Sequence, residues 1–144
     1  EGISVFSFTI FLHKNKGAER GENMVSTFLM DGLRICHLGA LGHELEDEVI
    51  SEIGLVDILF VPVGGNMTLD PKQAVAVTRS LEPNIVIPMH YKTDQHDEKV
   101  FAELATLEDF LQAYETEVES QEKLNISSPS SLPEEMELVV LKQQ

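Results

Sequence analysis

Residues 56–63, VDILFVPV, form an almost wholly apolar run. A short run of this kind is typical of a strand that is buried on both faces of a parallel sheet. Asp70 and Pro71 follow after a glycine-containing loop and have the chemistry of a helix N-cap and first turn. Residues 84–89, NIVIPM, repeat the apolar pattern and end at His90. The centre of the chain therefore predicts a strand–helix–strand unit with parallel pairing.

Toward the N-terminus, the apolar residues are mostly β-branched or aromatic, which favours strands. The Asp31–Gly32 pair separates two such runs and predicts a two-residue hairpin turn, because both central residues of that turn need a positive φ. Between the hairpin and the central unit, Leu45, Val49 and Ile53 recur every fourth residue and predict a helix. The predicted strands cover residues 3–12, 24–30 and 33–38, and the predicted helix covers residues 44–53.

Toward the C-terminus, residues 98–114 have an amphipathic pattern that predicts a helix. Residues 136–141, MELVVL, alternate weakly and predict a last strand. The order β-β-β-α-β-α-β-α-β favours an α/β (α+β) fold, with a mixed sheet and helices on one face. We expect residues 1–118 to form this sheet with its helices, residues 119–133 to be a polar linker, and residues 134–144 to add the final strand to the same domain.

The other face of such a sheet would carry apolar side chains that the chain does not obviously cover. Several come from the buried strands and alternate with strand parity. The candidates are Val5, Phe6, Phe8, Ile58, Phe60, Ile85 and Ile87.

The charge balance excludes some partners. The chain has 25 acidic and 10 basic residues, a net charge of −15, and residues 94–144 hold 13 of the acids and 3 of the bases. Such a surface repels nucleic-acid phosphates and anionic lipids, and no apolar run reaches the roughly 20 residues that span a bilayer. We therefore expect no nucleic acid and no membrane as partner. The single cysteine and the lack of a basic signal-peptide segment favour a cytoplasmic location.

Histidines mark the ends of predicted strands. His13, His37 and His90 each follow an apolar run. Polar groups at strand ends are how an α/β scaffold builds a site, and imidazole is a natural ligand for zinc, iron or manganese. Taken alone, each of these histidines is more typical of a hydrogen-bonded structural residue; the three together, all on strand ends, favour a shared site as much as separate structural roles. Cys36 lies inside a predicted strand, which is typical of a buried, inert thiol.

Three blocks of the sequence resemble the metallo-β-lactamase-fold hydrolases, in the order and spacing of that family. They are residues 37–43 (HLGALGH), 61–65 (VPVGG) and 87–91 (IPMHY). The branch they resemble is the metal-dependent hydrolases related to L-ascorbate 6-phosphate lactonase, and the segment around His13 and residues 17–23 is similar to that branch as well. The resemblance implies an αββα sandwich of two halves with one or two metal ions at the edge between the sheets.

The resemblance also implies a ligand set, which this sequence matches only in part. His13 and His90 match family metal ligands, of zinc or manganese. His37, His43 and Asn23 are candidates for side chains that support those ligands. Departures from the family are Ala40, where an aspartate binds the metals, and Lys14, where the branch usually has an aspartate. The HxHxDH signature of the N-terminal half is absent from the sequence. The chain thus resembles the C-terminal half of the fold.

A catalytic metal needs about three protein ligands and an open position for water. Two histidines for two different metals do not meet that need. We therefore expect a metal-dependent hydrolase of the lactonase-like branch that is inactive as this chain alone. The alternative is a non-catalytic, degenerate half-fold that acts as an oligomeric or partner-binding module. In both cases the expected partner is a second copy, in a sheet-stacked dimer, or an N-terminal half-domain.

Overall fold

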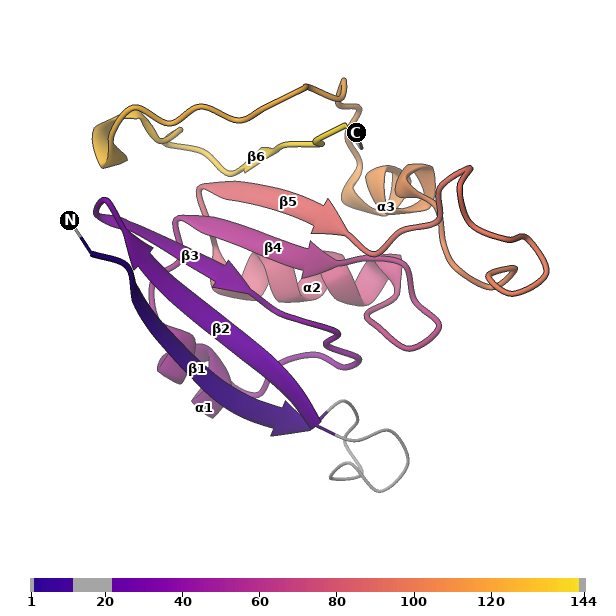
Figure 1. Ribbon diagram of the computed structural model, residues 1–144, viewed down its shortest axis with the longest axis horizontal. Coiled ribbons are helices and arrows are strands. Elements are labelled where there is room, and N and C mark those ends of the chain that lie inside the picture. Colours follow the sequence, from indigo (N-terminus) through magenta and orange to yellow (C-terminus); the bar gives the residue numbers. More distant parts are fainter. Residues whose placement is uncertain (1, 12–21, 143–144) are drawn as a thin grey trace.

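A mixed sheet whose strand order follows the sequence organises the protein in the computed structural model, which describes residues 2–11 and 22–142 (Figure 1). The first three strands are antiparallel, and each strand from the third to the sixth is parallel to its neighbour. The strands are β1 (Ser4–Phe11), β2 (Glu22–Met30), β3 (Leu33–His37), β4 (Ile58–Pro62), β5 (Ile85–Met89) and β6 (Glu137–Leu138).

The helices pack on one face of this sheet; in Figure 1, α1 and α2 lie behind it and α3 lies beside the end of β5. They are α1 (Asp47–Ile53), α2 (Pro71–Leu81) and α3 (Leu107–Tyr114), and a short 3-10 turn, η1 (Pro129–Ser131), lies in the C-terminal segment. This arrangement confirms the predicted α/β class with a mixed sheet and the predicted order of strands and helices. No helix in the described part of the chain is long and apolar enough to cross a membrane.

Local sequence signals set several of these boundaries. Asp31 and Gly32 have φ values of 51° and 80°, as the predicted hairpin turn requires. Asp70 caps α2: its carboxylate accepts the N–H of Gln73 at 2.9 Å, and the Gln73 amide oxygen accepts the N–H of Asp70 at 3.1 Å. Gly54 ends α1 with a φ of 70°. The predicted hairpin turn and the predicted cap at Asp70 are confirmed.

The predicted helix over residues 98–114 is too long at its N-terminal end. The helix α3 begins at Leu107, because Thr106 caps it by accepting the N–H of Asp109 at 3.2 Å. Upstream, the Asp97 carboxylate accepts the N–H of Lys99 at 2.8 Å, which holds a turn instead of a helix. The apolar spacing that suggested a single helix therefore joins a loop to a helix.

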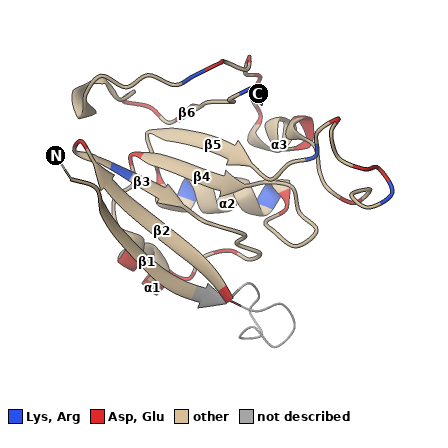
Figure 2. Cartoon of the chain, viewed as in Figure 1, with Lys and Arg blue, Asp and Glu red and all other residues tan. Residues whose placement is uncertain are grey.

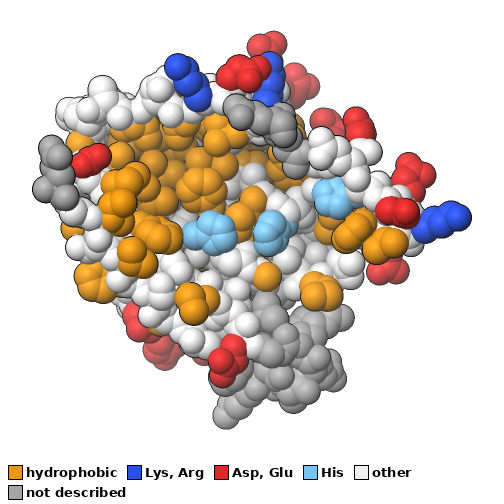
Figure 3. All heavy atoms as spheres, in the orientation of Figure 1, with side chains coloured by type: hydrophobic (Ala, Val, Ile, Leu, Met, Phe, Trp, Pro, Cys, Tyr) orange, Lys and Arg blue, Asp and Glu red, His pale blue; other side chains and the backbone are white. Residues whose placement is uncertain are grey.

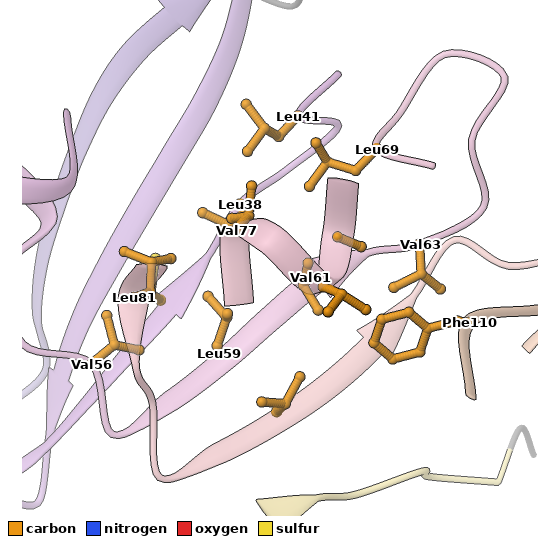
Figure 4. Close-up of a cluster of buried hydrophobic side chains, with 14 of the residues drawn as sticks. Leu38, Leu41, Val56, Leu59, Val61, Val63, Leu69, Val77, Leu81 and Phe110 are labelled. Atoms are coloured by element: carbon orange, nitrogen blue, oxygen red, sulfur yellow. The ribbon is translucent and has the colours of Figure 1, made fainter. Parts of the chain in front are cut away.

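The main core fills the space between the sheet and the helices (Figure 4). Alternate residues of the strands point into it and meet the buried stripes of α2 and α3. The side chains labelled in Figure 4 are Leu38, Leu41, Val56, Leu59, Val61, Val63, Leu69, Val77, Leu81 and Phe110. Full burial of a side chain of this size contributes roughly 1.5–3 kcal/mol, so this layer dominates the stability of the fold.

The opposite face of the sheet is only partly open, which corrects one expectation from sequence. Ile58, Ile85 and Ile87 are just 3–5% exposed. They pack with Leu124, Ile126 and Leu132, which belong to the segment 119–133 that the sequence analysis takes as a polar linker. Its apolar residues are too sparse to give a periodic pattern, yet they are enough to cover one end of the sheet.

The remaining candidates divide between the two faces. The strand register places Val5 opposite Phe28, and Phe28 opposite Ile35, on the face away from the helices. Phe6 and Phe8 alternate with Val5 and lie on the helix side, where Phe8 packs against the main core. Val5 is 54% exposed and Phe6 is 64% exposed. Figure 3 shows a hollow lined by hydrophobic side chains on the face of the sheet away from the helices.

The acidic residues gather away from the sheet. Figure 2 shows them on α1, on α3, in the loop before α3 and along the C-terminal segment, while the strands carry few charges. The strands of the sheet therefore present few charges to the surfaces that pack against them.

Candidate functional site

The candidate site lies where β3, β4 and β5 end. These strands are parallel neighbours, so their C-terminal ends meet at one edge of the sheet. His37 is the last residue of β3, and His90 directly follows β5. The ring of His37 stacks on Phe60 of β4, with 5.8 Å between the ring centroids. Figure 3 shows histidine side chains in a row on the face of the molecule turned to the viewer.

Asn23 holds the loop that follows His37. This side chain is buried at the start of β2. Its Nδ2 donates to the carbonyl oxygen of Leu38 at 2.8 Å, and its Oδ1 accepts the N–H of Ala40 at 2.8 Å. Gly39 between them has a φ of 63° and lies so close to Asn23 that a Cβ would overlap the amide. The loop conformation is therefore fixed by one buried amide and one glycine.

The protonation of His37 follows from its hydrogen bond. Its Nδ1 accepts the backbone N–H of Gly39 at 3.0 Å, so the neutral ring carries its proton on Nε2. Burial lowers the pKa of His37, and the nearby positive charge of a protonated His90 lowers it further. Burial also lowers the pKa of His90. Both rings are therefore neutral at pH 7. Neutral imidazole is the form that binds a metal ion, but the Nδ1 lone pair of His37 is already taken by Gly39, so of the two rings only that of His90 is a candidate ligand.

The backbone of His90 is held in an unusual position. Its φ of 59° is left-handed, which costs energy for a residue other than glycine. The adjoining loops are bonded together: the N–H of Ala105 donates to the carbonyl of Gly64 at 2.7 Å, and the N–H of Lys92 donates to the carbonyl of Ala105 at 2.8 Å. These contacts fix the loop after β4 and the segment that follows His90 relative to each other.

The other residues predicted from sequence have different places. His43 lies in the loop before α1, with its Nδ1 2.7 Å from the carbonyl oxygen of Glu44. Cys36 is buried, and its pKa is raised to about 12 by desolvation, as expected of an inert thiol. His13 and Lys14 lie outside the described residues, so the pairing of His13 with His90 as family-type ligands stays a prediction.

The donor set decides whether this edge can hold a metal by itself. Within residues 2–11 and 22–142, no three His, Cys, Asp or Glu side chains are grouped so as to hold a metal ion. His90 offers one imidazole, the Nδ1 of His37 is bonded to Gly39, and Ala40 has a methyl group where the family resemblance implies a carboxylate. About three protein ligands are required. The described residues therefore do not form a complete metal centre.

A cavity of about 570 Å³ opens beside His90. Sequence reasoning missed its other wall, which carries His96, Phe101 and Met67. Phe101 falls within the helix predicted over residues 98–114. The turn at Asp97 that places it in the cavity leaves only an Asp-x-Lys pattern in the sequence. The remaining lining residues are Gly65, Asn66, Thr68, Pro88, Met89, Tyr91 and Leu104.

This fold and this strand-end site define a class of protein. A family model described as the beta-lactamase superfamily domain matches residues 1–90, and the chain belongs to that superfamily, in its metallo-β-lactamase group. The resemblance predicted from sequence is confirmed.

Curated relatives agree with this assignment. A UPF0173 metal-dependent hydrolase of Thermoplasma acidophilum is 35% identical over 94 residues, which are 65% of this chain and 42% of the relative. Another, of Lysinibacillus sphaericus, is 36% identical over 78 residues, 52% of this chain and 34% of the relative. The chain thus spans less than half the length of these curated relatives.

Solved structures match nearly the whole chain. A protein of Thermotoga maritima, assigned to the zinc-dependent hydrolases of the metallo-β-lactamase superfamily, has a TM-score of 0.77 and 34% identity. The match covers 97% of this chain and 65% of that one. A metallo hydrolase of Ignicoccus hospitalis has a TM-score of 0.52 and 25% identity, over 83% of this chain and 50% of that one.

Proposed function

We propose that this chain is the C-terminal part of a metal-dependent hydrolase and forms one wall of its active site. One observation carries the proposal: two neutral imidazoles, His37 and His90, lie at the ends of β3 and β5, on either side of β4, and His90 also lines a cavity of about 570 Å³. The named activity of the curated relatives is consistent with it. The ion would be zinc or manganese, and the branch the lactonase-like one.

The ligands within the described residues do not complete a metal site. His90 can supply one ring nitrogen. The Nδ1 of His37 is occupied by the N–H of Gly39, so its neutral ring presents an Nε2–H donor that can orient a substrate oxygen. His13 and an N-terminal half-domain would supply the missing ligands.

The same half-domain is the partner we propose for the exposed apolar face. Val5 and Phe28 lie on that face, on the side of the sheet away from the helices, and leave an apolar strip that a second sheet would cover. A second copy stacked sheet to sheet is the other candidate. Light scattering coupled to gel filtration separates them: twice the chain mass at micromolar concentration supports the stacked dimer, and a monomer supports the half-domain. We place the complete protein in the cytoplasm.

A second function is favoured by one residue. The N–H of Ala40 is bonded to Asn23, so the loop keeps an ordered conformation. The methyl side chain of Ala40 cannot bind a cation. A half-fold that has lost catalysis and kept its fold, to bind a partner or a second copy, fits this. An HxHxDH segment encoded upstream of residue 1 would support the enzyme, and its absence there would support the binding module.

Titration calorimetry with ZnCl2 and MnCl2 on the EDTA-treated chain tests the enzyme proposal. We expect less than one equivalent of weakly held metal, lost in His90→Ala and kept in His96→Ala, whose ring is bonded to Thr93. We expect no hydrolysis of a lactone by the chain alone. A full equivalent retained through dialysis would mean that the chain holds a complete centre, and equal binding by His90→Ala would remove His90 from the site.

A further inference from the structure

The cavity beside His90 has a distinctive chemical lining. Its volume of about 570 Å³ is within the range of roughly 300–1,000 Å³ that holds small organic ligands. Apolar side chains make most of the wall: Met67, Met89, Phe101 and Leu104. None of the described residues that line it is Lys, Arg, Asp or Glu. Recognition of a phosphate or carboxylate normally uses a cationic side chain, above all that of arginine.

The rim of the cavity is apolar as well. Met67 is 57% exposed and Phe101 is 38% exposed. Phe101 does not turn away from the opening, because its ring meets His96 edge to face, with 4.9 Å between the ring centroids. Large apolar side chains at the mouth of a cavity gain free energy when a ligand covers them.

The polar groups of the wall can serve an uncharged ligand. The Nδ1 of His96 accepts the backbone N–H of Thr93 at 3.0 Å, so the neutral ring keeps its proton on Nε2 and offers a donor. The chain as a whole carries a net charge of −15, which opposes the approach of an anion.

We infer that this cavity binds an uncharged, apolar organic group that carries a hydrogen-bond acceptor, such as the acyl or aromatic part of a neutral ester or amide. This rests on the proposed function only in that the group would then belong to the substrate of the hydrolase. An enzyme with this cavity would not recognise a phosphorylated group through the residues that line it.

The five methionines give a direct test. Two of them, Met67 and Met89, line the cavity, while Met24, Met30 and Met136 lie elsewhere. The chain is labelled with ¹³C-methyl methionine, treated with EDTA, and titrated in an NMR experiment with N-benzylacetamide. Benzyl phosphate, which keeps the ring and adds charge, is the matched probe. Met67→Ala and Met89→Ala assign the two signals.

We expect N-benzylacetamide to shift the Met67 and Met89 signals with saturation, and benzyl phosphate to bind at least tenfold more weakly. Phe101→Ala should weaken binding of N-benzylacetamide at least fivefold. Val100→Ala removes a neighbouring side chain that is 68% exposed and does not line the cavity, and it should bind as the unchanged chain does.

Three outcomes would overturn the inference: benzyl phosphate binding as tightly as the amide, shifts confined to Met24, Met30 or Met136, or unchanged affinity in a Phe101→Ala variant that keeps its fold by circular dichroism. Because no metal is present, the result is separate from the metal titration above. A chain that binds the amide, and whose weak metal binding is unchanged in His90→Ala, would leave this inference in place while removing His90 from the proposed metal site.

Discussion

The carbonyl oxygen of His90 occupies the space in which a side chain on residue 64 would begin. A Cβ built on Gly64 would overlap this oxygen and press on the Leu104 side chain. The oxygen belongs to backbone that is already left-handed, so it cannot move aside as a flexible side chain would. The glycine at the end of β4 therefore sets the position of the candidate site residue after β5.

Gly64→Ala should destabilise the chain by about 1–3 kcal/mol, the usual cost of forcing extra atoms into packed structure. Urea unfolding followed by circular dichroism measures this. Gly2→Ala is the matched control, because nothing lies within 4 Å of a Cβ at that position. Equal stability of the two variants would show that the close approach of His90 to Gly64 is not a constraint.

Asn23→Ala should cost about 1–3 kcal/mol, because the buried carbonyl of Leu38 and the N–H of Ala40 lose their partner. The same urea experiment measures the loss. Ser7→Ala is the control: it removes an exposed hydrogen bond between Ser7 and Ser26, and should change stability by less than about 0.5 kcal/mol. If Asn23→Ala is as mild as Ser7→Ala, the amide does not hold the loop.

Local chemistry made much of the fold predictable. The hairpin at Asp31–Gly32 and the cap at Asp70 depend on neighbouring residues alone, so a single sequence contains their cause. For the same reason, the sequence places His37 and His90 at the ends of strands. Parallel pairing of those strands then predicts that both histidines lie at the same edge of the sheet.

What the sequence could not show depends on contacts between distant segments. The turn at Asp97 competes with a good helical pattern, and its outcome places Phe101 in the cavity. The cover that Leu124 and Ile126 give to Ile58 joins residues more than sixty positions apart, with no periodic signal. The role of Asn23 likewise appears only once β2 and the loop after β3 meet.

Acidification should destabilise the metal-free chain below about pH 6.5, the ordinary pKa of histidine. The folded pKa values of His37 and His90 are lowered, so the unfolded chain binds protons first, and stability is present above pH 6.5 and lost as the pH falls through the folded values. Urea unfolding between pH 7.5 and about 5, in EDTA, measures it.

The double variant His37→Gln with His90→Gln should flatten this pH dependence, because both titrating groups are gone. His43→Gln, which removes a histidine of the loop before α1, is the control and should keep the slope. An unchanged slope in the double variant would mean that other groups cause the pH dependence.

Cys36 should resist alkylation in the folded chain. Its pKa is raised from 9.0 to about 12, so the thiolate, which is the reacting form, is about a thousandfold rarer at a given pH. Iodoacetamide at pH 8, followed by mass spectrometry, should label the chain only when urea is added. Rapid labelling without urea would contradict the burial of this thiol.

Ala40→Asp tests how far the site is from binding a metal. The N–H of residue 40 is fixed by Asn23, three positions after His37, so the new carboxylate would start from an ordered backbone. We expect zinc affinity to rise about tenfold or more, in line with the effect of tuning groups around a metal. Ala40→Asn has nearly the same shape without the charge and should gain less.

Hydrolysis should not appear in either variant, because the HxHxDH ligands are still missing from the chain. Calorimetry measures the affinity, and release of acid from a simple lactone measures turnover. Turnover by Ala40→Asp that disappears when His90→Ala is added would show that the chain holds a more complete site than its described residues contain, and an unchanged zinc affinity would show that position 40 does not face the metal.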